Sequence, residues 1–225
     1  MNRAKLFHYI FPFVILSVPW IYLSIIWNQL PETIPTHFGI SGLPDKFGQK
    51  NEIIVAPAII SIIGLFTYFL MINIHKIDPK KKYKATTAGT LSKLAVVTLL
   101  FLCGTCLMII YWTLKGHIVG DTVLFSAIGL FFAYIGNLMY SIKPNYFAGF
   151  RLPWTLENEE NWRKTHQLAS KIWFAGGIVI ALISLFLRFR VLLIVFMSLV
   201  FIMVIIPVIF SYILYRKSSA SSNLN

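Results

Sequence analysis

Six long apolar runs constrain the fold of this 225-residue chain more than any other feature. A helix that crosses the roughly 30 Å hydrocarbon core of a bilayer needs about 20 predominantly apolar residues, because every backbone polar group must be paired inside the lipid. No run carries Asp, Glu, Lys or Arg near its centre. We therefore predict six transmembrane helices: Phe7–Trp27, Ile53–Ile74, Leu94–Leu114, Ile118–Tyr140, Leu168–Leu187 and Val191–Leu214.

Composition supports an integral membrane protein. The chain is 57% hydrophobic and 12% charged, whereas an ordinary soluble domain is about 25% charged. Only Arg188, Phe189 and Arg190 separate the last two runs. One continuous helix over both runs would be about 70 Å long, more than twice the thickness of the hydrocarbon core, so the chain must fold back here as a hairpin of two helices. The expected fold class is an all-α, polytopic bundle of six helices that passes repeatedly through the cell membrane.

The distribution of basic residues predicts the orientation of the bundle. With six spans both termini lie on one side, and only Lys46, Lys50, Lys115, Arg188 and Arg190 of the 20 Lys and Arg residues fall on the other. Positively charged loops favour the cytoplasm, so we expect both termini to be cytoplasmic. The net charge of +12 therefore requires no direct nucleic-acid partner. The basic cluster Lys76–Lys84 is expected to face anionic lipid of the bilayer.

The chain shows few signs of enzymatic chemistry. No phosphate-cradling glycine loop or metalloprotease motif is present, so we expect no catalytic residue, no cofactor and no metal. Cys103 and Cys106 have the spacing of a redox pair, but inside a span we interpret them as small packing residues. Asn73 and Asn137 are the notable polar residues of the spans. They leave open a transporter or lipid-handling protein as an alternative function.

Leu30–Glu52 is a first stretch too long for a simple turn. Its prolines disfavour a helix and its glycines permit positive φ, which predicts an ordered irregular loop or a short strand pair. The charge rule places this single Pro/Gly-rich loop outside the cell. A structural cap and a ligand-binding surface both fit it. The candidate surface for an external ligand consists of Pro31, Pro35, His37, Phe38 and Asp45.

The second long stretch, "GFRLPWTLENEENWRKTH", covers Gly149–His166 and is expected to be cytoplasmic. Thr155 is the predicted N-cap of a helix that begins near Leu156 and continues into the fifth span. Carboxylates in a first turn are favoured by the helix dipole. Anchoring of this helix at the membrane surface explains much of the stretch. A candidate surface for docking a partner remains, and it consists of Gly149, Arg151, Pro153, Trp154, Thr155, Trp162 and His166.

These two stretches carry a family resemblance. The motif from Gly149 to His166 resembles the signature of the SdpI family of bacterial membrane proteins. The segment "LPETIPTHFGISGLPDKFG" is similar to the Leu-Pro-x-x-Ile-Pro-x-His segment of a small domain that often precedes it. We accordingly expect residues 1–87 to form a two-span unit with an extracellular loop at 30–52. Residues 88–225 should form an SdpI-like four-span unit with a cytoplasmic motif loop at 143–167.

The resemblance also implies a function and two partners. It implies immunity to a secreted antimicrobial peptide that kills competing cells, which the outer loop would sense or exclude. It further implies signal transduction, in which the cytoplasmic stretch holds a small helix-turn-helix repressor at the membrane. None of these roles follows from composition or spacing.

Overall fold

The computed structural model describes residues 3–77 and 84–222. Six of its helices are long and apolar enough to cross a membrane, which confirms the predicted number of spans. The expected lipid-facing cluster at Lys76–Lys84 falls mostly on residues 78–83, outside the described residues. The elements in chain order are α1 (Arg3–Ile26), η1 (Trp27–Gln29), β1 (Thr33–Phe38), β2 (Pro44–Gln49), η2 (Lys50–Ile54), α2 (Val55–Ile77), α3 (Lys84–Lys115), α4 (Asp121–Met139), α5 (Pro153–Glu157), α6 (Glu159–Ile183) and α7 (Phe189–Ser222).

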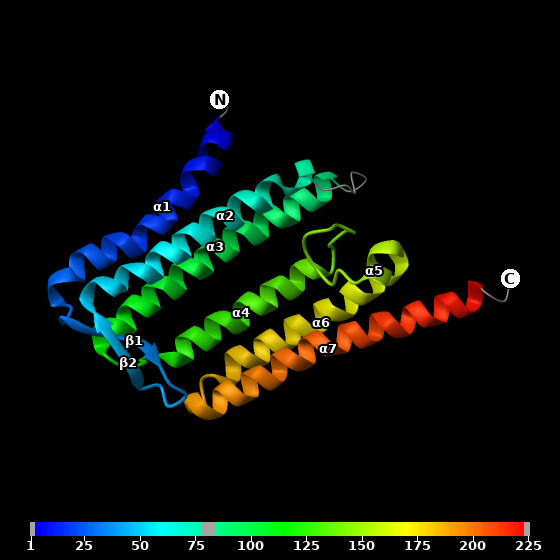
Figure 1. Cartoon of the computed structure of the whole chain (residues 1–225). Coiled ribbons are helices and arrows are strands. Elements are labelled where there is room, and N and C mark those ends of the chain that lie inside the picture. The colour runs from blue at the N-terminus through cyan, green and yellow to red at the C-terminus, as the bar shows by residue number, and fades with distance from the viewer. Residues whose placement is uncertain (1–2, 78–83, 223–225) are drawn as a thin grey trace.

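The long helices form two groups of three. Helices α1 and α2 pack on α3, whereas α6 packs on both α4 and α7 (Figure 1). The groups meet where α3 passes α4, and there Phe101 and Phe131 stack with ring centroids 4.5 Å apart. The third span thus packs with the first two.

Glycines allow the close approach of α4 and α6. A Cβ atom on Gly136 would meet the backbone nitrogen of Phe174 at 2.5 Å, and one on Gly129 would meet the carbonyl oxygen of Gly177 at the same distance. Helices in lipid associate through such small-residue contacts, because lipid tails provide no hydrophobic drive between them. The group of α4, α6 and α7 therefore depends on residues that bring backbones together.

Two prolines inside helices leave carbonyls that distant side chains satisfy. Pro207 has no N–H group, so it cannot pair with the carbonyl of Met203 one turn earlier, and the indole Nε1 of Trp173 donates to that oxygen at 2.9 Å. Pro19 likewise leaves the carbonyl of Ile15 without its helical donor, and the thiol of Cys103 lies 3.3 Å from that oxygen. Cys103 thus supplies a donor to the carbonyl that Pro19 leaves unpaired, in addition to packing.

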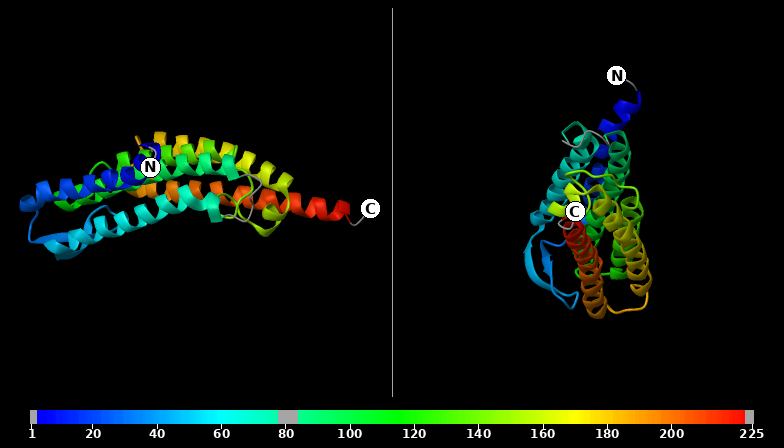
Figure 2. Two further views of the ribbon diagram at one scale, coloured as in Figure 1. Left: turned by 90° about the horizontal axis from the view of Figure 1, so that it is seen from above. Right: turned by 90° about the vertical axis from the view of Figure 1, so that its right-hand side faces the viewer.

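The bundle has two distinct ends. The β1–β2 hairpin and the α6–α7 turn form the hairpin end, while α5 and the loop before it form the motif-loop end. The start of α1 and the end of α7 both point away from the hairpin (Figures 1 and 2). This arrangement separates the two candidate surfaces by the full length of the spans.

The helix that enters the fifth span begins later than the sequence predicted. Pro153 starts the separate short helix α5, and α6 begins at Glu159. The side chain of Asn158 caps α6 by accepting from the backbone N–H groups of Glu160 and Asn161, both at 2.9 Å. The prediction of Thr155 as the N-cap was therefore wrong, because proline is favourable at a first helical position and moves the chain into α5 before Thr155.

Candidate functional site

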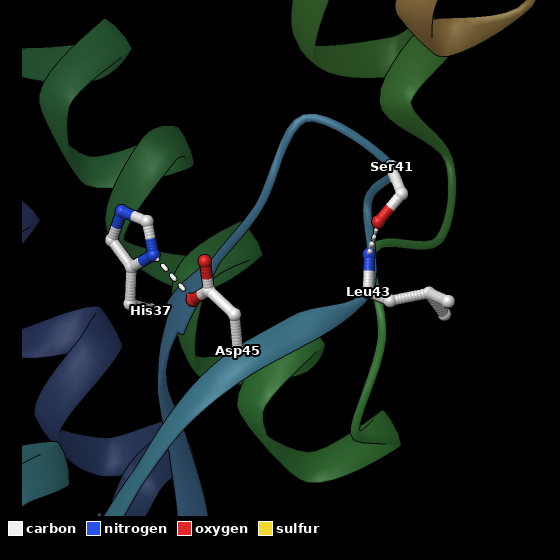
Figure 3. Close-up of polar contacts among 4 residues, drawn as sticks. All are labelled: His37, Ser41, Leu43 and Asp45. Atoms are coloured by element: carbon white, nitrogen blue, oxygen red, sulfur yellow. Dashed lines mark hydrogen bonds and ion pairs between the residues drawn. The ribbon is translucent and has the colours of Figure 1, made fainter.

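Strands β1 and β2 form the predicted strand pair, and the pairing contains two register shifts. The strands are antiparallel with Thr33 opposite Gln49, and the register shifts on both sides of His37. Such bulges leave extra residues unpaired and redirect side chains. Here His37 Nδ1 and Asp45 Oδ1 lie 2.5 Å apart, although His37 pairs with Lys46 along the ladder (Figure 3). Both side chains remain more than half exposed, at 60% and 52%.

The base of the hairpin is anchored in the first helix group. Leu30, Ile34 and Ile53 are buried in a cluster with residues of α1 and α3, and Ile34 is 1% exposed. The backbone N–H of Lys50 also donates to the carbonyl of Glu32 at 2.9 Å. The hairpin is therefore an ordered cap that apolar burial holds on the bundle.

The tip of the hairpin reaches towards the second helix group. Gly42 adopts a φ of +78°, which glycine adopts readily, and its carbonyl accepts from the backbone N–H of Ile118 in the loop before α4 at 3.2 Å. A Cβ atom added to Gly42 would also contact Phe189 at the start of α7. The hairpin thus touches both groups at one end of the bundle.

The five residues predicted for the external surface divide by burial. Pro31, His37 and Asp45 are exposed, Phe38 is half-buried and Pro35 is buried. Pro35 and Phe38 line a mainly apolar pocket of about 430 Å³ between the hairpin, α2 and α3. The structure therefore presents a polar pair on the hairpin and an apolar pocket beneath it.

At the other end, the motif loop is organised by a residue that the sequence reading missed. Asn145 is fully buried, and its amide nitrogen donates to the carbonyls of Lys143 and Ala148 at 2.9 and 3.2 Å. Its side-chain oxygen accepts from the backbone N–H groups of Phe147 and Ala148. All four hydrogen-bonding positions of the amide are used. The dipeptide Pro144-Asn145 was the available turn signal.

Trp162 and His166 lock the loop onto α6. The indole Nε1 of Trp162 donates to the carbonyl of Ile142 at 3.0 Å. The backbone N–H of Phe150 donates to His166 Nε2 at 2.9 Å, so the ring proton resides on Nδ1, which donates to the carbonyl of Trp162 at 2.8 Å. Gly149, with a φ of +105°, leaves room for this contact because a Cβ atom there would clash with Nε2. The imidazole is thereby held neutral.

A second network ties α5 and α6 to α7. Trp154 Nε1 donates to the hydroxyl of Ser211 at 3.0 Å, and the amide of Asn161 donates to the carbonyl of the same serine at 2.9 Å. The Trp154 ring also stacks on Tyr215, with centroids 5.8 Å apart. Within the loop, the buried Thr155 hydroxyl donates to the carbonyl of Phe150 at 2.7 Å. Asn161 and Ser211 lack a motif signal of their own, since the fold brings them together across 50 residues.

The seven residues predicted to dock a partner thus divide into buried residues and exposed residues. Thr155, Trp162 and His166 are at most 1% exposed and stabilise the fold. Trp154 is half-buried, while Gly149, Arg151 and Pro153 are exposed. Arg151 is oriented by a 2.9 Å hydrogen bond from Nη1 to the carbonyl of Tyr146. Only the exposed residues and the edge of Trp154 can contact a partner on this surface.

The two asparagines that motivated the transport alternative lie near helix ends. Asn137 is exposed and lies two residues before α4 ends at Met139. Asn73 lies near the end of α2, where its amide donates to the carbonyl of Phe69 at 2.8 Å and its oxygen accepts from Lys76. Both asparagines therefore lie in the last turns of their helices rather than near the helix centres.

The fold and its two ends define a multi-pass helical protein of the cell membrane. Within this class, residues 141–211 match the SdpI/YfhL protein family, and residues 14–61 match a domain of unknown function, DUF1648. The first match covers the motif loop, α5, α6 and most of α7, and the second covers the hairpin. The C-terminal part of the chain is therefore similar to the SdpI/YfhL family, and the N-terminal part is similar to DUF1648.

Two curated proteins extend the comparison. The chain is 26% identical to Immunity protein SdpI of Bacillus subtilis (strain 168) over 209 residues, which is 92% of this chain and 96% of that protein. It is also 45% identical to an uncharacterized protein of Archaeoglobus fulgidus over 49 residues, or 22% of this chain and 27% of that protein. No solved structure matches.

Proposed function

We propose that this chain is an immunity protein that protects the cell membrane from a secreted killing peptide. The observation that carries the proposal is the end-to-end similarity to a curated immunity protein, which spans 92% of one chain and 96% of the other. The similar region includes the hairpin, the motif loop and all six spans, so the similarity extends beyond one shared motif. We further propose that the hairpin end faces outward and that both termini are cytoplasmic, which agrees with the distribution of basic residues.

The hairpin is the proposed contact surface for the peptide. Its exposed His37–Asp45 pair supplies polar groups, and the neighbouring 430 Å³ pocket supplies apolar surface for a hydrophobic side chain. The hairpin itself is held by buried residues elsewhere. A change to the exposed pair should therefore alter recognition while it leaves the fold intact, which makes the pair a suitable target for mutation.

Survival of a sensitive strain tests this proposal. Expression of the wild type should raise survival in the presence of the killing peptide, and His37→Ala or Asp45→Asn should lower that protection at equal protein levels. His117→Ala is the matched control, because this exposed histidine lies on the loop between α3 and α4, near Gly42 of the hairpin, and its ring contacts the carbonyl of Lys115. Unchanged survival with the wild type, across several such peptides, would refute the immunity function.

A second part of the proposal concerns signal transduction. We infer that the exposed edge of the motif loop, Gly149, Arg151 and Pro153 with the edge of Trp154, docks a small cytoplasmic repressor. A rigid loop supports this inference, since Asn145 and His166 fix the backbone from which Arg151 projects. Arg151 offers a planar fork of donors that suits a carboxylate on a partner.

Localisation of a fluorescently tagged helix-turn-helix repressor encoded beside the gene tests this second part. The repressor should move to the membrane when the wild type is expressed, and Arg151→Gln should return it to the cytoplasm. Arg151→Lys keeps the charge but loses the fork, so it should recover only part of the recruitment. Lys164→Gln is the control for net charge, because Lys164 lies on α6 and pairs with Glu160. Full recruitment by Arg151→Gln would refute docking at this edge.

A further inference from the structure

A pocket of about 370 Å³ opens at the motif-loop end, where α4 ends and α6 begins. One side is lined by Tyr140–Pro144 and the other by side chains of the first turns of α6, between Glu159 and Gln167. The proposed immunity function and the repressor-docking edge do not use this pocket. Its chemistry therefore calls for a separate explanation.

Two of the lining side chains form a fixed wall. Trp162 uses its indole N–H on the carbonyl of Ile142, and His166 uses both ring nitrogens, on Phe150 and on Trp162 itself. Their rings stack with centroids 4.1 Å apart. This wall is rigid and offers a ligand no further polar group, so specificity must come from the other lining residues.

Arg163 and Gln167 supply such polar groups. They lie one helical turn apart and thus share a face of α6. Within the described residues, Arg163 forms no ion pair shorter than 4 Å, whereas its neighbour Lys164 pairs with Glu160 at 2.8 Å. Lys143 brings a second cation to the pocket and Glu159 brings one carboxylate. Positive charge thus exceeds negative charge around the opening.

We propose that this pocket binds a phosphate group, carried either by the headgroup of a phospholipid or by a small soluble phosphate. Guanidinium groups bind phosphate bidentately, and the amide of Gln167 adds a donor on the same helix face. The position of the pocket at the end of α4, beside the exposed aromatic residue Tyr140, corresponds to the level of lipid headgroups, where aromatic residues are enriched. Arg163 is the principal anion ligand and Lys143 raises the local positive potential.

Native mass spectrometry of the purified full-length chain tests this proposal. Phosphatidylglycerol should form a specific adduct, whereas diacylglycerol with the same acyl chains and no phosphate should not. Arg163→Gln should reduce the adduct at least fivefold, and Gln167→Leu should reduce it to a smaller extent. Arg163→Lys should give an intermediate result because it keeps the charge but loses the fork. Inorganic phosphate forms the second arm and should displace the lipid at millimolar concentration.

Lys164→Gln is the matched control, because it removes the same charge from the adjacent position of α6 and lies outside the pocket. It should leave the adduct unchanged. Binding of inorganic phosphate without phosphatidylglycerol would support the phosphate site and assign a soluble ligand to it. Equal losses in Arg163→Gln and Lys164→Gln would overturn the proposal in favour of general surface charge, as would the absence of binding in both arms. Melting temperatures of all variants establish that the chain remains folded.

Discussion

The indole of Trp162 lies against the imidazole of His166, with the ring centroids 4.1 Å apart and the ring planes inclined by 23°. Both rings are at most 1% exposed, and each is hydrogen-bonded to the loop that precedes α5. The stacked pair therefore joins a loop to a helix entering the membrane. Its role is to fix the backbone from which the exposed motif residues project.

Replacement of His166 by leucine should destabilise the protein. The variant leaves the backbone N–H of Phe150 without its acceptor, and an unsatisfied buried donor costs about 1–3 kcal/mol. Thermal unfolding in detergent, followed by tryptophan fluorescence, measures the loss. His117→Leu is the control and should change the stability by less than about 0.5 kcal/mol, because that histidine is exposed. Equal melting temperatures for the two variants would contradict the assigned role of His166.

Gly177→Ala should separate α4 from α6. The added Cβ atom would meet the backbone of Ala133 and Gly129 well inside contact distance, and backbone atoms cannot yield as a flexible side chain does. Overpacking of this kind costs about 1–3 kcal/mol. Gly104→Ala in α3 is the matched control, since a Cβ atom there meets nothing within 4 Å. Chemical denaturation in mixed micelles measures both variants, and similar stabilities would argue against close packing at Gly177.

The bond from Trp173 to Met203 should depend on Pro207. Trp173→Phe removes the indole donor and should cost about 0.5–1.5 kcal/mol in the wild type. In a Pro207→Ala background the residue at 207 regains its N–H group and satisfies the same carbonyl, so the second substitution should cost less. A double-mutant cycle on the free energy of unfolding measures the coupling. A coupling energy of zero would show that the indole does not compensate for the proline.

Asn158→Ala should weaken the start of α6. Loss of an N-cap side chain costs about 0.5–2 kcal/mol, and Asn158 accepts two backbone N–H groups here. Asn158→Asp keeps the acceptor and should retain most of the stability. Hydrogen exchange of the amides of Glu160 and Asn161 reports the change locally. Exchange rates that are unchanged in Asn158→Ala would place the cap elsewhere.

Much of the fold could be predicted because the bilayer imposes simple requirements on the chain. The length of an apolar run alone decides whether it can cross the hydrocarbon core, and Arg188–Arg190 marked the last turn between two such runs. The start of α6 was harder to predict. Thr155 and Asn158 are both good capping residues, and the choice between them depends on whether Pro153 begins a separate helix.

The amino-acid sequence by itself determined six spans, a hairpin-forming Pro/Gly-rich segment and a motif typical of the SdpI family. These features depend on residues close together in the chain. Only the tertiary structure decided which motif residues are buried. Tryptophan, histidine and threonine are stable on a surface or in a core, provided that their polar atoms are paired when buried. Those partners, Ile142 for Trp162 and Phe150 for His166, lie 20 and 16 residues away and are brought close by folding.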